Sequence, residues 1–116
     1  MKVLVCGDRN WDNIEAIARE LKKLPEGTVI VHGAARGADT IAGLVAEEIG
    51  FVIEAYPADW NKYGKGAGHI RNKQMLDEGK PKIVFAFHSD IGSSKGTKNM
   101  VEQAKRADIK TIIFKE

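Results

Sequence analysis

Two glycine-rich segments of the sequence carry the residue types that hold phosphate groups. The first, residues 33–40 (Gly-Ala-Ala-Arg-Gly-Ala-Asp-Thr), follows an apolar run and leads directly into a helical pattern. Small residues at such a junction leave backbone N–H groups uncovered at the positive end of a helix dipole, where anions bind. The segment matches neither a Walker A loop nor a G-x-G-x-x-G dinucleotide fingerprint. It therefore predicts a generic anion-binding loop, with a tight strand–helix packing turn as the alternative.

The second segment, residues 92–97 (Gly-Ser-Ser-Lys-Gly-Thr), also follows an apolar run and opens a helical pattern. Its hydroxyls, its lysine and its backbone N–H groups are all donors that an oxyanion accepts. Two such loops at the same edge of a sheet favour a ligand site over two structural turns.

Side chains near other chain segments extend this site. Arg9 can clamp an anion with paired donors, and Arg71 and Asn72 lie where a helix is expected to begin. Asp39 is expected to cap a helix, with a ribose hydroxyl as its alternative partner. The residues expected to contact the ligand are Gly7, Asp8, Arg9, Gly33, Arg36, Gly37, Asp39, Arg71, Asn72, Gly96 and Thr97.

A third segment, residues 57–68, mixes aromatic rings, glycines and lysines. This composition suits a lid or a wall that stacks on a nucleotide base. A packed loop anchored by Trp60 and Tyr63 is the alternative.

Metal, disulfide and hydrolase-triad chemistry find little support in the sequence. His32, His69 and His88 lack the spacing of metal ligands, and the single cysteine, Cys6, ends an apolar run typical of a buried strand. A G-x-S-x-G nucleophile elbow is absent. The sequence therefore predicts no metal and no resident cofactor. An acid–base role stays open for His32 and His88, because both follow apolar runs near the expected site.

Five short apolar runs alternate with amphipathic segments, and this alternation must position the loops. The runs cover residues 3–6, 29–31, 52–56, 83–87 and 111–114 and are nearly continuous, as in strands buried on both faces. Strand–helix alternation forces crossover connections and a parallel sheet. We therefore expect a single Rossmann-like α/β domain over residues 1–116, three-layered, with a mainly parallel five-stranded sheet and helices on both faces. Its ligand site is expected at the carboxyl ends of the strands.

Amphipathic spacing predicts helices in the first two gaps between these strands. Their apolar faces are Ile14, Ile17, Ala18 and Leu21, and then Ile41, Leu44, Val45 and Ile49. Asp12 with Glu15 resembles a capping box for the first helix. Gly50 is suited to end the second helix.

Two more helices are expected in the second half of the chain. The third covers residues 68–78 with a weak apolar face, after an irregular segment at residues 57–67. The fourth carries Met100, Val101 and Ala104 on one face and is expected to be capped by Thr97.

The charge balance argues against a nucleic-acid-binding surface. The chain of 116 residues has 18 basic and 16 acidic side chains, a formal net charge of +2, and no clustered basic stripe. No apolar stretch approaches the roughly 18 residues of a membrane span, and residues 2–6 are too short for a signal peptide. The single cysteine fits a reducing compartment. We therefore expect a cytoplasmic protein without a membrane or nucleic-acid partner.

Taken together, these motifs resemble the YspA-type branch of the SLOG superfamily. The ordered set that carries the resemblance is Gly7-Asp8-Arg9 with Trp11, residues 32–39, residues 57–60, Tyr63-Gly64, Ala67-Gly68, Arg71-Asn72 with Met75, and Gly96-Thr97. It spans nearly the whole chain. The resemblance implies a Rossmann-like fold and a nucleotide or nucleotide-derived small-molecule ligand. It also implies self-association, with a homodimer as the simplest form and Trp11, Trp60 and the third helix as candidate surfaces.

Relatives in that superfamily include LOG-type phosphoribohydrolases, which cleave the base from a nucleoside monophosphate, and the DNA-processing protein DprA. They carry a Pro-Gly-Gly-x-Gly-Thr-x-x-Glu loop and an arginine followed four residues later by methionine. Arg71 and Met75 match the second element, whereas Met100 stands at the glutamate position of the first. The carboxylate that stabilises an oxocarbenium-like sugar in those hydrolases is therefore missing.

Three functions remain open at this point. Binding or sensing of a nucleotide-derived molecule is favoured, because it does not need the missing glutamate. Nucleotide hydrolysis of the phosphoribohydrolase type is the first alternative, with Arg71, Asp8 and Asp39 as candidate catalytic residues. Single-stranded DNA binding is the second alternative, and the weak net charge argues against it.

Overall fold

A five-stranded parallel sheet forms the centre of the structure, a computed structural model that describes all 116 residues. The strands are β1 (Lys2–Gly7), β2 (Val29–His32), β3 (Val52–Ala55), β4 (Ile83–Phe87) and β5 (Lys110–Phe114). Their order across the sheet is β3-β2-β1-β4-β5, and every neighbouring pair is parallel. The chain therefore places β2 and β3 on one side of β1 and then crosses back to place β4 and β5 on the other side. The predicted α/β fold with five parallel strands is confirmed.

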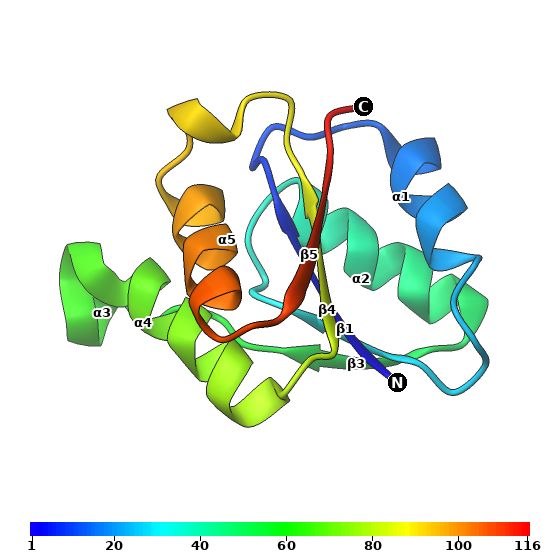
Figure 1. Cartoon of the computed structure of the whole chain (residues 1–116), viewed down its shortest axis with the longest axis horizontal. Helices are drawn as coiled ribbons and strands as arrows, with labels where there is room; N and C mark the ends of the chain where they lie inside the picture. The colour runs from blue at the N-terminus through cyan, green and yellow to red at the C-terminus, as the bar shows by residue number, and fades with distance from the viewer.

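Helices cover both faces of this sheet. Figure 1 shows α1 (Ile14–Leu21) and α2 (Ala38–Ile49) on one side of the strands. The other side carries α4 (Ala67–Gln74), a π-helical turn (Met75–Gly79) and α5 (Gly96–Arg106). The predicted three-layer arrangement is therefore also confirmed. No helix combines the length and hydrophobicity that crossing a membrane requires.

The central strand β1 serves two separate hydrophobic cores. Val3 and Val5 belong to the core beneath α1 and α2, and Leu4 and Cys6 belong to the core beneath α5 and the π-helical turn. Successive side chains of a strand point to opposite faces of its sheet, so a strand covered on both sides must be apolar throughout. This explains why the run at residues 3–6 is continuous rather than alternating.

Helix α1 begins one residue later than predicted. Its N-cap is Asn13, whose Oδ1 accepts the N–H of Ala16 at 3.1 Å, so the expected cap at Asp12 is wrong. The backbone carbonyl of Asp12 accepts the N–H of Ile14 at 3.0 Å, which holds Asp12 outside the helix. Ile14 is then the first helical residue and is 57% exposed instead of joining the core.

Helix α2 packs on the sheet through small side chains. Ala38, Ala42 and Ala46, spaced four residues apart, are fully buried, while Leu44 is 63% exposed. Alanines on the inner face let the helix axis approach the strands closely, and that orientation turns Leu44 toward solvent. The prediction that Leu44 lies on the apolar face is therefore wrong. Gly50 ends the helix with a φ of 100°, as expected.

Helix α5 begins at Gly96 and is capped by a residue before it. The Ser94 hydroxyl accepts the N–H of Thr97 at 3.0 Å. Thr97 lies inside the first turn with its side chain buried, so the expected cap at Thr97 is wrong.

The segment predicted to be irregular between β3 and the third helix is largely helical. It contains α3 (Trp60–Tyr63), capped by Asp59, and a 3-10 turn (Gly64–Gly66). Figure 1 shows α3 set apart from the sheet, next to α4. This segment reaches the candidate site from outside the sheet.

Candidate functional site

A cavity of about 910 Å³ opens where the carboxyl ends of β1, β2 and β4 meet the segments α3 and α4. Its volume lies in the range of sites for small molecules and cofactors. The strand order changes direction between β1 and β4, and ligands of open α/β sheets bind at such a switch point. The cavity is therefore located where this architecture places ligands.

Most of the residues expected to contact a ligand line this cavity. They are Gly7, Asp8, Arg9, Arg36, Asp39, Arg71, Asn72, Gly96 and Thr97. Gly33 and Gly37 are the two expected contacts that the lining does not include. Neither glycine reaches the cavity surface, because other groups of the protein lie directly against it. A Cβ atom on Gly33 would collide with the Arg71 guanidinium, and one on Gly37 would collide with the backbone of Asp8 and Arg9.

Positive charge is concentrated in the cavity although the whole chain is nearly neutral. The charged lining consists of five cations (Arg9, Arg36, Lys65, Arg71 and Lys95) and two carboxylates (Asp8 and Asp39). Such a concentration of cations in a concave site raises the local concentration of an anionic ligand.

The N-terminus of α5 offers backbone donors to this cavity. The N–H of Thr97 is taken by Ser94, but the N–H groups of Gly96 and Lys98 donate to no group of the protein. A Cβ atom added to Gly96 would meet nothing within 4 Å, so the backbone there is open. Free N–H groups at the positive end of an 11-residue helix are donors of the kind that bind anions in other proteins. The side chain of Lys95 lines the cavity at the same end.

The loop between β2 and α2 already holds an anion of its own. Oδ2 of Asp39 accepts the N–H of Gly33 at 3.0 Å and the N–H of Ala35 at 3.3 Å. The donors expected to bind phosphate there are therefore used by a side chain of the same loop. The N-cap of α2 is Gly37, which has no side chain to cap the helix. The expectation that Asp39 caps this helix is therefore wrong.

Burial controls the protonation of Asp39. It raises the pKa of this carboxyl to about 6, while the N–H groups of Ala35 and Gly33 and the charge of Arg71 act in the opposite direction. Burial also lowers the pKa of Arg71, which the nearby Asp39 charge partly offsets. Asp39 and Arg71 thus stabilise each other's charged forms across the floor of the cavity.

Arg71 is fixed by the protein at two of its nitrogens. Its Nη1 donates to the carbonyl of Gly33, and its Nε donates to Oδ1 of Asn72 at 3.2 Å. Its Nη2 makes no hydrogen bond within the protein and remains available to a ligand in the cavity. A guanidinium held in this way is oriented before the ligand arrives.

Asn72 holds Arg71 and the start of α5 in register. Its Oδ1 accepts from Arg71, and its Nδ2 donates to the carbonyl of Gly96 at 3.2 Å and to Oδ1 of Asn99 at 3.1 Å. The side chain of Gln103 donates to the same Asn99 oxygen at 2.7 Å. Because these bonds occupy its polar atoms, Asn72 acts as a positioning residue for the cavity wall.

Two histidines at strand ends share one backbone arrangement. Nδ1 of His32 accepts the N–H of Ala34, and Nδ1 of His88 accepts the N–H of Asp90, each at 2.9 Å. An imidazole that accepts at Nδ1 is neutral and carries its proton on Nε2. Both side chains are therefore donors at Nε2 and not general bases at that atom. Burial, and next the charge of Arg71, lower the pKa of His32, which favours the same neutral form.

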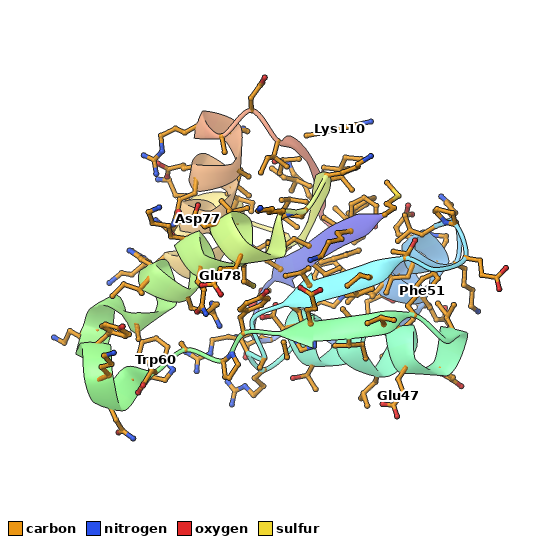
Figure 2. All side chains as sticks on the ribbon, turned by 90° about the horizontal axis from the view of Figure 1, so that it is seen from below. Glu47, Phe51, Trp60, Asp77, Glu78 and Lys110 are labelled. Carbon is orange, nitrogen blue, oxygen red and sulfur yellow. The ribbon has the colours of Figure 1, made fainter.

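Twelve lining residues were not among the expected contacts, and they include Trp60, Lys65, His88, Ser94 and Lys95. Four of these lie in the segments at residues 57–68 and 92–97 that the sequence singled out, and His88 was named there as a histidine that follows an apolar run. Trp60 is 59% exposed, and Figure 2 places it beyond the end of the sheet on the segment that carries α3. An exposed indole at the wall of a cavity offers a flat surface to a ligand.

The lining also contains Cys6, whose thiol is buried. Burial, and next the negative charge of Asp39, raise the pKa of this thiol well above its usual range, so it stays protonated. No three His, Cys, Asp or Glu side chains lie close enough together to hold a metal ion.

Sequence comparison agrees with this geometry. Residues 1–63, which include β1, β2, β3 and the loops at their ends, match the YspA, cpYpsA-related SLOG family. The chain belongs to this family. It is also similar to the Gene 61 protein of Mycobacterium phage D29, with 38% identity over 122 residues that cover 97% of this chain and 95% of that protein. Membership in the SLOG family suggests a nucleotide-related role.

The position where hydrolase relatives carry a glutamate is part of the core in this SLOG protein. Met100 is fully buried among Leu4, Val84 and Val101 and does not line the cavity. A carboxylate at this point would lie under α5 and not beside a ligand.

Proposed function

We propose that the cavity binds a nucleotide or a nucleotide-derived small molecule, and that the protein acts as a binding or sensing module. The observation that carries the proposal is the convergence of five cations and the open N-terminus of α5 on one cavity at the switch point of the sheet. Cations and free N–H groups of this kind complement a phosphate. The family membership supports the same ligand class.

In this proposal the phosphate lies at the N-terminus of α5. The free N–H group of Gly96 and the side chains of Lys95 and Arg71 hold it, and Arg9 and Arg36 neutralise charge on the other side of the cavity. The exposed indole of Trp60 stacks on the base. Gly33 and Gly37 contribute by letting Arg71 and the β1 loop approach, since their Cα atoms are covered by those groups.

Binding is favoured over hydrolysis by the states of the polar groups in the cavity. Asp39 is engaged with backbone N–H groups, and His88 presents a donor to the cavity. Oδ2 of Asp8 and Oδ1 of Asp39 are the carboxylate oxygens of the cavity lining that accept no hydrogen bond from the protein. Incubation with AMP, GMP, CMP and UMP, followed by chromatography for free base and ribose 5-phosphate, tests the hydrolase alternative. Release of either product at a rate that falls in Asp8→Asn would favour hydrolysis.

Thermal denaturation with a ligand panel tests the proposal. The panel contains AMP, GMP, CMP, UMP, ADP, ADP-ribose and cyclic di-AMP. A member present at ten times its Kd is expected to raise Tm by about 5 °C. Lys95→Gln is expected to weaken binding severalfold, while Lys105→Gln, at the exposed far end of the same helix, is expected to leave it unchanged. A panel in which no member raises Tm would refute the proposal.

A further inference from the structure

Asp8 and His88 lie side by side at the switch point of the sheet. Gly7 and Phe87 are paired in the register of β1 and β4, and Asp8 and His88 are the residues that directly follow them. The backbone N–H of Asp8 donates to the carbonyl of Phe87 at 2.9 Å, which holds the carboxyl ends of β1 and β4 together. Both side chains line the cavity. The two residues are therefore held in one place by the strand pairing itself.

Each side chain has one polar atom fixed by the backbone and one atom left over. Oδ1 of Asp8 accepts the N–H of Asn10 at 2.8 Å, so Oδ2 remains an acceptor without a donor. Nδ1 of His88 accepts the N–H of Asp90 at 2.9 Å, so its proton lies on Nε2. The pair thus presents one charged acceptor and one neutral donor.

The separation of the two free atoms suits one bridging oxygen. Oδ2 of Asp8 and Nε2 of His88 are 3.9 Å apart, which is too long for a direct hydrogen bond. An oxygen about 2.8 Å from each atom would subtend an angle of about 90° between them, which a hydroxyl can accommodate. Such an oxygen must donate to Asp8 and accept from His88. A hydroxyl does both, whereas a phosphate oxygen cannot donate and is repelled by the carboxylate.

We propose that Asp8 and His88 bind a hydroxyl group of the ligand's sugar and thereby select ribonucleotides over nucleotides that lack sugar hydroxyls. This inference rests on the proposed function and deepens it, because it concerns the same cavity. The hydroxyl donates to Oδ2 of Asp8 and accepts from Nε2–H of His88. In strand order, Asp8 lies between the Arg36 loop after β2 and the α5 N-terminus after β4. Cationic groups thus lie on both sides of Asp8, and a ligand whose charged groups bind to them places its sugar beside the Asp8 carboxylate.

Calorimetry with matched nucleotides tests the inference. The probes are AMP and GMP, each compared with its 2′,3′-dideoxy analogue, together with any other panel member that raises Tm and its dideoxy form. The wild type is expected to bind the ribonucleotide about tenfold or more tightly, since a hydrogen bond to a charged group is lost in the analogue.

Two histidine variants separate the hydroxyl contact from general damage. His88→Asn keeps an acceptor for the N–H of Asp90 and removes the Nε2 donor. It is expected to weaken ribonucleotide binding about tenfold and to change binding of the dideoxy form less than twofold. His32→Asn is the matched control, because His32 makes the same backbone bond with Ala34 but does not line the cavity. It is expected to change neither affinity more than twofold.

Asp8→Asn provides a second test if His88→Asn does not fold. The Asp8 side chain is 25% exposed, and asparagine keeps an acceptor for the N–H of Asn10. This variant is expected to reduce the preference for the ribonucleotide to less than twofold. Equal binding of both probe types by the wild type, or equal losses for both in the variants, would overturn the inference while leaving phosphate binding intact. Absence of binding by every panel member would overturn the proposed function and this inference together.

Discussion

The Asp39 carboxylate accepts a hydrogen bond from the backbone N–H of Gly33 at 3.0 Å, so the first turn of α2 places a negative charge inside the loop that precedes it. The loop residue Ala35 donates to the same oxygen. The charge occupies the position that an external anion takes in other glycine-rich loops. Arg71, held on the carbonyl of Gly33, faces the same loop from α4. The backbone N–H groups of this loop that could bind a phosphate are thus already used by a carboxylate of the protein itself.

Replacement of Asp39 by asparagine is expected to stabilise the protein at neutral pH. The folded-state pKa of Asp39 is raised to about 6 by burial, from 3.8 in an unfolded chain. Between these values the folded state binds more protons than the unfolded state, so the Asp39 contribution to stability falls as pH rises through about 4 to 6. Above that window the cost of burying the charge is fully present. Asp39→Asn keeps an acceptor oxygen and removes this cost, which should add up to about 3 kcal/mol at pH 7.5, since the attraction to Arg71 is already included in the raised pKa.

Urea unfolding of both proteins from pH 4 to pH 8 measures this effect. The stability gap between Asp39→Asn and the wild type should be smallest at pH 4 and should widen up to about pH 7. Asp12→Asn, the same change at an exposed position, is the control and should show no such widening. A gap that is constant over this range would mean that folding does not shift the pKa of Asp39.

Replacement of Asn72 by aspartate is expected to destabilise the contact between α4 and α5. The Nδ2 group of Asn72 donates to the carbonyl of Gly96 and to Oδ1 of Asn99, and the side chain is buried. A carboxylate oxygen in its place faces two acceptors, which should cost about 2–4 kcal/mol at pH 7. Protonation restores one donor, so the loss should be smaller at pH 4. Chemical denaturation at the two pH values measures both effects, with the exposed Asn61→Asp as control. Losses of equal size at the two sites would show that the network contributes nothing.

Gly37 was expected to touch the ligand, and its environment leads to a prediction about stability instead. Its φ is +81°, and a Cβ atom there would collide with the backbone of Asp8 and Arg9. Gly27 has a nearly identical φ of +83° with nothing within 4 Å of a Cβ atom. Gly27→Ala should therefore cost about 1 kcal/mol for backbone strain alone, and Gly37→Ala about 3 kcal/mol or more. Urea unfolding of the two variants gives the difference. Equal losses would mean that the β1 loop moves aside without cost.

The strands and the sheet edge that carries the site could be predicted from sequence because each depends on local pattern. The run at residues 3–6 is continuously apolar, Gly7 is the last residue of β1, and Gly33 directly follows β2. The partners of the polar groups could not be predicted in the same way. Whether Gly33 donates to a ligand or to Asp39 depends on the three-dimensional path of the loop, and either outcome uses the same residues.

The same limit applies to contacts between distant parts of the chain. Asn72 and Gly96 are 24 residues apart, and their hydrogen bond requires α4 and α5 to pack together on the same face. Asp8 and His88 become neighbours only through the pairing of β1 with β4, and five parallel strands are compatible with several strand orders. The wrong prediction of the N-cap of α1 has a local cause. Both Asp12 and Asn13 are good N-cap residues, and only the backbone path selects the second.

Replacement of Trp60 by alanine is expected to weaken ligand binding without changing stability. The indole is 59% exposed and lines the cavity, so its removal creates no void in either core. Stacking of a base on an aromatic side chain contributes about 1–3 kcal/mol, which corresponds to a loss of about tenfold or more in affinity. Tyr63→Ala on the same short helix is the matched control, because Tyr63 is 43% exposed and does not line the cavity. Calorimetry with the nucleotide that raises Tm most, and with ribose 5-phosphate, completes the measurement. Trp60→Ala should lower affinity for the nucleotide and not for ribose 5-phosphate, because only the nucleotide carries a base. Equal losses for both probes would place Trp60 against the sugar or phosphate instead.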